Sequence, residues 1–303
     1  MAIAGLPEEE YFSKGHRACA GCGAAIAMRL LTKAAGPDTV LVESTGCMEV
    51  ISTPYPETAW KLPWIHGAFE NNSSIGTGVE AALKRLGRKA NVVVFGGDGA
   101  TYDIGFGAIS GMFERGNNIT YVCYDNEAYM NTGIQRSSST PFGASTTTSP
   151  SGKKSIGKPQ WKKDIIHIIA AHGSPYVATA SIAYTQDVYK KIKKAIETEG
   201  PTFVNVYCGC VPGWKYQPEK TIELSKLGVE TGVTPIFEIT GGKHKLNMPR
   251  NVDKLKPVED YLKPQGRFRH LFIPEKDEKN LAFIQEKVKD NLKLLLKYEE
   301  CDL

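Results

Sequence analysis

The sequence lacks several features that would assign a protein to a class at once. No apolar run approaches the roughly 18–20 residues that a membrane-spanning helix needs. The net charge of +4 is too small to indicate binding to nucleic acid. Residues 1–10 hold three consecutive glutamates and no signal-peptide pattern. These absences predict a cytoplasmic protein with neither a membrane nor a nucleic-acid partner.

The cysteine usage excludes two further arrangements. Seven cysteines in a cytoplasmic chain of 303 residues argue against a disulfide framework. There is no dense Cys-x-x-Cys-x-x-Cys-x-x-x-Cys run of the ferredoxin kind, and no internal repeat. Clustered cysteines in such a chain favour metal binding or redox chemistry instead.

Strand-like and helical segments alternate along most of the chain. Buried-strand patterns occur at 39–43, 92–95, 119–124, 176–180 and 203–207, and helical patterns at 24–35, 76–87, 102–115, 164–172 and 186–198. This alternation predicts an α/β fold with a doubly wound, mainly parallel sheet. The stretch 52–64 contains three prolines and is predicted to be irregular.

The pattern changes beyond about residue 232. The stretch 235–269 has little periodicity, and 278–299 is a charged amphipathic helix. We therefore expect a domain at 1–232 and a C-terminal extension, or arm, at 233–303 that packs on the domain or on partner subunits. A polar Ser/Thr/Gly/Pro-rich stretch at 131–158 predicts a functional loop or one that a partner orders.

Two neighbouring strands end in oxygen-bearing residues. The strand at 92–95 runs into Gly96-Gly97-Asp98-Gly99-Ala100, and the strand at 119–124 into Asp125-Asn126. The carboxyl edge of a parallel sheet binds ligands, and glycine lets a pyrophosphate approach the main chain. Asp98 and Asn126 carry oxygen ligands that suit Mg²⁺. The 26 residues between Gly99 and Asn126 leave room for a crossover helix, so a metal-diphosphate site is favoured over two simple turns.

Four cysteines are expected at the same edge. Cys19 and Cys22 form a Cys-x-x-Cys pair, and Cys47 and Cys210 follow predicted strands. Such a set could hold a [4Fe–4S] cluster, structural zinc, or simply buried thiols or a redox disulfide. Cys208 competes with Cys210 for this position, since only one of the two is expected to face the site, and the pattern leaves the choice open.

Other residues have simpler expected roles. Cys123 lies within a strand, where cysteine packs as a small hydrophobe. Cys301 lies in the C-terminal tail and is expected to be structural or incidental. For Trp60, Trp64 and Trp214, core packing is favoured over walls of a cofactor pocket.

Four motifs together resemble a known family: Gly-His-Arg-Ala-Cys19-Ala-Gly-Cys22-Gly, Ser-Thr-Gly-Cys47, Gly-Gly-Asp98-Gly-Ala and Asp-Asn126-Glu-Ala-Tyr-Met-Asn131-Thr-Gly-Ile-Gln. The chain resembles the beta subunits of 2-oxoacid:ferredoxin oxidoreductases, most closely those of pyruvate:ferredoxin oxidoreductases. The resemblance implies a sheet of the thiamine-diphosphate-binding type. It also implies conversion of pyruvate and coenzyme A to acetyl-CoA and CO₂, or the reverse, with electrons passing through a [4Fe–4S] cluster to ferredoxin.

The resemblance implies roles for single residues around the cofactor. Asp98, Asn126 and the main-chain carbonyl of Ala128 would bind Mg²⁺. Asn131 would face thiamine and substrate in a catalytic role. The residues implied to contact thiamine diphosphate are Cys47, Gly97, Asp98, Gly99, Ala100, Asn126, Glu127, Ala128, Tyr129, Met130 and Asn131. The chain departs from the family at Ala24, where some members carry a glutamate, so no side-chain contact is expected there.

The resemblance also assigns the cluster ligands. They would be Cys19, Cys22, Cys47 and Cys210, since the family has cysteine directly before a segment like Val-Pro-Gly-Trp214. Cys208 matches no ligand position.

Two missing parts imply partner chains. The glutamate that activates thiamine would come from the pyrimidine-binding domain of an alpha subunit, since no such second domain fits in 303 residues. Ferredoxin-like gamma and delta subunits would supply further clusters. The substrate stays open, because 2-oxoisovalerate, an aryl 2-oxoacid and 2-oxoglutarate are alternatives to pyruvate. A different class is a non-redox thiamine decarboxylase or synthase whose cysteines hold structural zinc.

Overall fold

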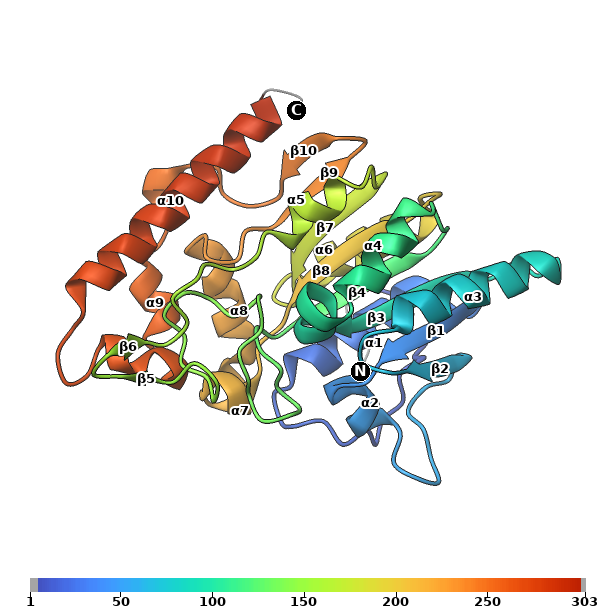
Figure 1. The fold of residues 1–303 in the computed structure, drawn as a ribbon, viewed down its shortest axis with the longest axis horizontal. Helices are drawn as coiled ribbons and strands as arrows, with labels where there is room; N and C mark the ends of the chain where they lie inside the picture. The colour runs from blue at the N-terminus through green and yellow to red at the C-terminus, as the bar shows by residue number, and fades with distance from the viewer. Residues whose placement is uncertain (1–4, 301–303) are drawn as a thin grey trace.

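The sheet at the centre of the molecule has eight strands. In a computed structural model, residues 5–300 are described; Cys301 lies outside them. The strand order is β10-β9-β7-β8-β4-β3-β1-β2 (Figure 1). The strands are β1 (Thr39–Ser44), β2 (Trp64–Gly67), β3 (Asn91–Gly97), β4 (Thr120–Asp125), β7 (Tyr176–Ser181), β8 (Thr202–Tyr207), β9 (Phe237–Thr240) and β10 (Lys243–Leu246). The first six named are parallel, whereas β9 pairs antiparallel with both β7 and β10.

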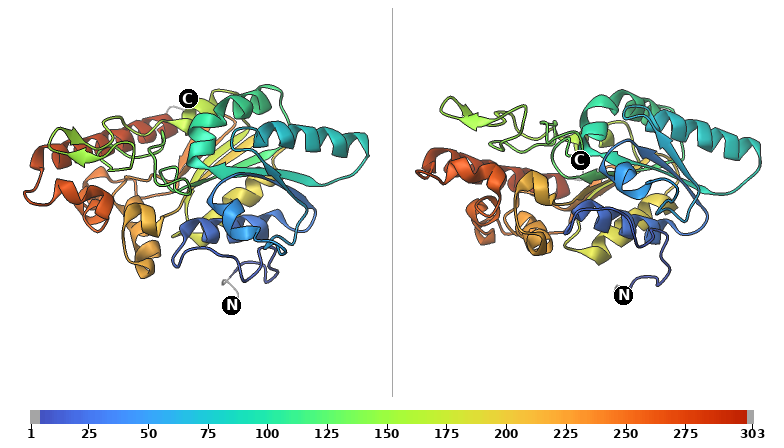
Figure 2. Two further views of the ribbon diagram at one scale, coloured as in Figure 1. Left: turned by 60° about the horizontal axis from the view of Figure 1, so that its bottom comes forward. Right: turned by 90° about the horizontal axis from the view of Figure 1, so that it is seen from below.

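Helices cover both faces of this sheet, as the two views in Figure 2 show. One face packs on α1 (Gly23–Ala35) and α6 (Thr185–Glu197). The other packs on α3 (Asn72–Arg85), α4 (Phe106–Glu114) and α5 (Ile165–Ala170). The central strands are buried on both sides, which explains their continuous apolar sequences. The predicted α/β fold with a doubly wound, mainly parallel sheet is confirmed.

A third group of buried side chains joins the long loop to the C-terminal segment. It includes Ala144 from the loop, Trp214, Phe268 and Ile284. The remaining helices are α2 (Cys47–Ser52), α7 (Val211–Trp214), α8 (Thr221–Glu230), α9 (Val258–Leu262) and α10 (Glu278–Glu300). The helix predicted at 278–299 is confirmed as α10, which contributes to two of the apolar clusters.

Several short elements were not expected from the sequence. The irregular stretch predicted at 52–64 is bordered by α2 and by the edge strand β2. The loop at 131–158 carries a small hairpin of β5 (Ser151–Gly152) and β6 (Ser155–Ile156), which projects from the body in Figure 2. Strands β9 and β10, after residue 232, join the same sheet as the strands before it. The division into 1–232 and 233–303 stays a prediction.

The crossover helix predicted at 102–115 is wrong at its start. A π-helical turn, Gly99–Ile104, comes first, and α4 begins only at Phe106. The N–H of Gly105 donates to the Ala100 carbonyl at 2.9 Å, and a side chain at position 105 would overlap that oxygen. Hydrophobic periodicity cannot reveal this widened turn, which is common at functional sites.

Among residues 5–300, no helix has the length and apolar character required to cross a membrane.

Candidate metal-diphosphate site and cysteine group

The candidate site lies at the carboxyl edge of the sheet, where the chain connections diverge. From β1 the chain continues to β2 on one side, whereas from β3 it continues to β4 on the other. In open α/β sheets such a divergence leaves a crevice between the ends of the two strands. The loops that follow β1 and β3 both border a cavity of about 280 Å³.

Most of the residues predicted to contact the cofactor line this cavity. They are Cys47, Gly97, Gly99, Ala100, Asn126, Ala128, Tyr129, Met130 and Asn131. Thr45, Gly46, Phe69, Tyr124 and Thr132 line it as well. The cavity therefore brings together four segments that are separate in the sequence.

Three oxygen atoms converge at one side of this cavity. The amide oxygen of Asn126 faces only acceptors, with Asp98 Oδ1 at 2.9 Å and the Ala128 carbonyl at 3.0 Å. With the amide turned over, its NH₂ would donate to both. In the other orientation, a cation between the three oxygens would offset their mutual repulsion. Mg²⁺ bound octahedrally at about 2.1 Å places neighbouring ligand oxygens about 3 Å apart, so the set fits this ion.

Asp98 is fully buried and is oriented by the long loop. The Ser137 hydroxyl donates to Asp98 Oδ2 at 2.5 Å, which leaves Oδ1 directed at Asn126 and Ala128. Burial and the nearby charge of Asp125 raise the pKa of the Asp98 carboxyl well above its usual value, and the Ser137 hydrogen bond acts in the opposite direction. A carboxylate in such surroundings gains from a bound cation.

We expect Ser137→Ala to weaken divalent-metal binding by about 10- to 100-fold, because partners of metal ligands commonly contribute that much. The change removes the hydroxyl that donates to Asp98 Oδ2. Metal titration of the assembled complex measures the effect. Ser155→Ala, in the exposed hairpin of the same loop, is the matched control. Equal affinity in the two variants would contradict the role of Ser137.

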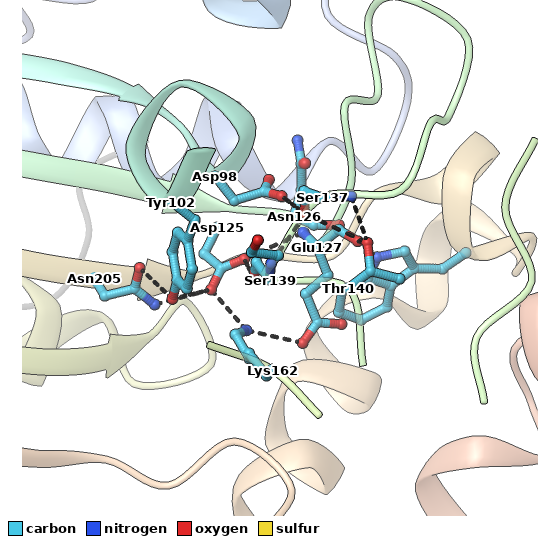
Figure 3. A network of polar contacts seen from close by, with 12 residues as sticks. Asp98, Tyr102, Asp125, Asn126, Glu127, Ser137, Ser139, Thr140, Lys162 and Asn205 are labelled. Carbon is cyan, nitrogen blue, oxygen red and sulfur yellow. Dashed lines mark hydrogen bonds and ion pairs between the residues drawn. The ribbon is translucent and has the colours of Figure 1, made fainter. Parts of the chain in front are cut away.

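A buried network of charged side chains surrounds the segment that contains Asn126. Figure 3 shows the Lys162 ammonium group between the carboxylates of Asp125 and Glu127, at 2.7 and 3.2 Å. Ser139 also donates to Asp125 at 2.6 Å, and Arg267 pairs with Glu127 at 2.6 Å. Two carboxylates and two cations thus balance each other, and Asp98 contacts neither cation. This leaves a negative charge at the site for a metal ion.

Glu127 differs from its predicted neighbours. Its backbone is left-handed, with φ of 68°, and its side chain is not part of the cavity wall. The left-handed turn directs the carboxylate away from the cavity and toward Lys162 and Arg267. The carboxylate of Glu127 therefore belongs to the supporting network, and its predicted contact with the cofactor stays a prediction.

The glycines around Asp98 have an additional reason to be glycine. A side chain at position 99 would overlap the ring of Tyr129, whose hydroxyl donates to the Gly99 carbonyl at 3.2 Å. A side chain at position 97 would press on Tyr124. Both positions line the cavity, so glycine here serves close packing of tyrosines as well as access to the main chain.

The four cysteines predicted as ligands lie in one neighbourhood. Burial raises the pKa of the Cys47 thiol to about 12. The charges that add most to this shift are those of Cys210, Cys22 and Cys19. The N–H of Gly23 donates to the Gly209 carbonyl at 3.1 Å, which joins the start of α1 to the segment containing Cys210. Cys47 also lines the cavity, so the cysteine group and the cavity adjoin.

Zinc and a four-iron cluster require different spacings of their sulfur ligands. In the part of the chain that the structure describes, no three His, Cys, Asp or Glu side chains lie close enough together to hold a single metal ion. Tetrahedral zinc with bonds of about 2.3 Å would need its sulfurs about 4 Å apart. A four-iron cluster holds its thiolates farther apart because each binds a different iron. Whether the four cysteines hold a cluster or zinc stays a prediction.

The structure separates Cys210 from Cys208. Cys208 is 1% exposed and packs in the apolar core beside α1 and α6. Cys210 is partly exposed, and its pKa is raised to about 12 by burial, with smaller contributions from Cys22 and Cys19. Cys123 is fully buried in β4, as predicted.

Four residues important to this arrangement were not identified from the sequence. Ser137, Lys162 and Arg267 carry no local motif. Trp214 is buried, as favoured, but its indole N–H also donates to the Asn126 carbonyl at 2.8 Å. Only the position of Trp214 shortly after Cys210 offered a signal, since α7 begins between them.

Comparison with known proteins gives three similarities. Residues 44–206 match the family described as thiamine pyrophosphate enzyme, C-terminal TPP binding domain. The chain is 55% identical over 297 residues to the pyruvate synthase subunit PorB of Methanocaldococcus jannaschii, covering 95% of this chain and 99% of that protein. It is 47% identical over 272 residues to the ketoisovalerate oxidoreductase subunit VorB of Pyrococcus abyssi, covering 88% of each.

A solved structure shares the fold. It is a 2-oxoglutarate:ferredoxin oxidoreductase from Magnetococcus marinus with 2-oxoglutarate, coenzyme A and succinyl-CoA bound. The TM-score is 0.56 at 24% identity, and the match covers 74% of this chain and 83% of that chain.

Proposed function

This chain belongs to the thiamine pyrophosphate enzymes, and among them to the beta subunits of 2-oxoacid:ferredoxin oxidoreductases; from that premise we propose that it serves a pyruvate:ferredoxin oxidoreductase. The reaction is oxidative decarboxylation of pyruvate with coenzyme A to acetyl-CoA and CO₂, or the reverse. The position of Cys47 carries the proposal, because this residue borders the cavity and also interacts with the three other cysteines.

The proposed magnesium and diphosphate site uses the converging oxygens. Asp98 Oδ1, Asn126 Oδ1 and the Ala128 carbonyl would hold Mg²⁺, and their spacing of 2.9 to 3.0 Å supports this. Gly97, Gly99 and Ala100 would contact the diphosphate, and Asn131 would face thiamine and substrate from the cavity wall. Thiamine diphosphate, when bound, supplies the electron sink for loss of CO₂ from a 2-oxoacid.

The proposed [4Fe–4S] cluster is held by Cys19, Cys22, Cys47 and Cys210. Their mutual electrostatic influence supports it. A cluster at this place would accept electrons one at a time from the neighbouring cavity, which a thiamine decarboxylase with structural zinc cannot do. Cys47 would keep the cluster next to the thiamine cavity, because it is a proposed cluster ligand and also lines the cavity.

The proposed complex contains further chains and works in the cytoplasm. An alpha subunit would contribute the pyrimidine-domain glutamate, and ferredoxin-like gamma and delta subunits would carry electrons to ferredoxin. The cavity has an open mouth. A partner at this mouth would complete the enclosure that decarboxylation chemistry needs.

Anaerobic electron paramagnetic resonance of the assembled complex tests this function. We expect a cluster signal that changes when pyruvate and coenzyme A are added, together with iron and sulfide in cluster proportion. Zinc without iron in the assembled complex would overturn the oxidoreductase assignment in favour of a non-redox thiamine enzyme.

Turnover with a panel of acids tests the substrate. We expect pyruvate to have the highest kcat/KM among pyruvate, 2-oxoisovalerate, an aryl 2-oxoacid and 2-oxoglutarate. The identity to PorB exceeds that to VorB, which supports this order. Comparable or higher efficiency with 2-oxoisovalerate would overturn pyruvate as the substrate while leaving the thiamine chemistry in place.

A further inference from the structure

One arginine of the C-terminal extension reaches the proposed metal site. Arg267 lies in a 3-10 helix, Gly266–Leu271, and is 3% exposed. Its Nη2 lies 2.6 Å from Glu127 Oε2, and its Nε donates to Gln265 Oε1 at 2.8 Å. The guanidinium carbon lies 4.0 Å from the centre of the Trp214 ring. A buried arginine with this set of contacts is fixed in a single position.

The contacts of Arg267 converge on the segment that carries two proposed metal ligands. Glu127 stands between Asn126 and Ala128 in the sequence and has a left-handed backbone, with φ of 68°. This conformation is unfavourable for a residue with a side chain and persists where its surroundings enforce it. Next to this residue, the Asn126 side-chain amide lies 2.9 Å from Asp98 Oδ1 and 3.0 Å from the Ala128 carbonyl.

The main chain of this segment is held as well. Trp214, on which Arg267 stacks, donates its indole N–H to the Asn126 carbonyl at 2.8 Å. The Thr140 hydroxyl donates to the Glu127 carbonyl at 2.7 Å. Arg267 therefore acts on both sides of the left-handed residue: on its carboxylate directly, and on the preceding peptide through Trp214.

We propose that Arg267 is a positioning residue that holds Glu127 left-handed and thereby sets the metal-ligand geometry of Asn126 and Ala128. The inference rests on the proposed function, since it assigns a purpose to this geometry. It gives the C-terminal extension a part in the site, although Arg267 does not line the cavity. Lysine cannot replace arginine here, because the planar guanidinium stacks on Trp214 while donating to two partners.

The test uses the assembled complex and Mn²⁺ as the probe. The signal of free Mn²⁺ in electron paramagnetic resonance gives its dissociation constant in the presence of thiamine diphosphate, without any turnover. We expect Arg267→Gln to weaken Mn²⁺ binding by about 10-fold or more, in the range for residues behind metal ligands. Arg267→Lys should fall between that variant and wild type. Arg269→Gln, an exposed arginine of the same 3-10 helix, should bind as wild type does.

A second substitution separates positioning from general stability. Glycine adopts a left-handed backbone readily. Adding Glu127→Gly to Arg267→Gln also removes the carboxylate that would be left without its arginine, so the double variant should recover most of the lost affinity. A role of Arg267 in folding alone predicts no recovery. If Arg267→Gln does not assemble, the same comparison is made with Arg267→Lys.

The outcomes are distinct. If the wild-type complex binds no Mn²⁺ with thiamine diphosphate, the proposed function itself fails. If wild type binds Mn²⁺ but Arg267→Gln and Arg267→Lys bind it as tightly as wild type does, the role of Arg267 is refuted. Weakened binding that Glu127→Gly does not recover also overturns the positioning role. Iron content and the cluster signal should match wild type in every variant, since none of the cysteines is changed.

Discussion

Cys210→Ala is expected to remove the cluster and reduce ferredoxin reduction to the background of the assay, whereas Cys208→Ala leaves both near wild type. The two cysteines differ by two positions in the sequence but not in chemistry. Cys210 is partly exposed beside Cys22 and Cys19, whereas Cys208 packs in the core. Loss of one of four thiolates leaves one iron without its protein ligand.

Iron and sulfide analysis of the complexes measures this difference. Cys210→Ala should lose about four iron atoms per beta chain, the content of one [4Fe–4S] cluster. Cys208→Ala should retain them and cost about 1 kcal/mol of stability, because it removes a small buried side chain. Loss of iron from Cys208→Ala with full retention in Cys210→Ala would reverse the proposed ligand set. Thermal unfolding of both complexes separates iron loss from misfolding.

Asp98→Asn is expected to have opposite effects on stability and on activity. The amide keeps the shape of the side chain but loses the charge that the metal needs. Metal affinity should fall by more than about 100-fold, beyond the range for residues behind the ligands. Turnover with pyruvate should fall with it, because the diphosphate would lose its bridging ion.

In the absence of metal and cofactor, the same substitution should raise the melting temperature. The Asp98 carboxyl is fully buried near Asp125, and both burial and that charge disfavour its ionised form. An amide removes this cost and can donate to the oxygens of Asn126 or Ala128, which lie within the same group. Asp38→Asn, at an exposed position before β1, is the control. A melting temperature unchanged or lowered by Asp98→Asn would contradict the account of the buried charge.

Much of the fold was predictable because the parallel strands are buried on both faces. Such strands have continuous apolar sequences, so β3, β4, β7 and β8 were located within about two residues, the usual uncertainty of element boundaries. Edge strands lack this signal, and the two edge strands β2 and β10 were missed for that reason, whereas β9, which pairs with β10 and β7, has only four residues. The π-helical turn at Gly99–Ile104 was missed because it depends on a close contact between Gly105 and Ala100.

The candidate site, too, was predictable from the sequence only in part. The kinds of atom that the proposed ligands offer could be read from Asp98, Asn126 and the spaced cysteines, because ligand type is a property of single residues. The direction in which each side chain points could not be read from the sequence. Glu127 has a carboxylate like that of Asp98, yet its left-handed backbone directs it to Lys162 and Arg267.

By itself, the sequence determined the sheet class, the edge at which ligands gather and the kinds of atom available there. Those properties follow from local periodicity and from which residues end each strand. Only the tertiary structure decided which groups orient the ligands. Ser137 reaches Asp98 across 39 positions and Arg267 reaches Glu127 across 140. Contacts of that range depend on how the long loop and the C-terminal extension pack, because no local pattern encodes the meeting of two distant segments.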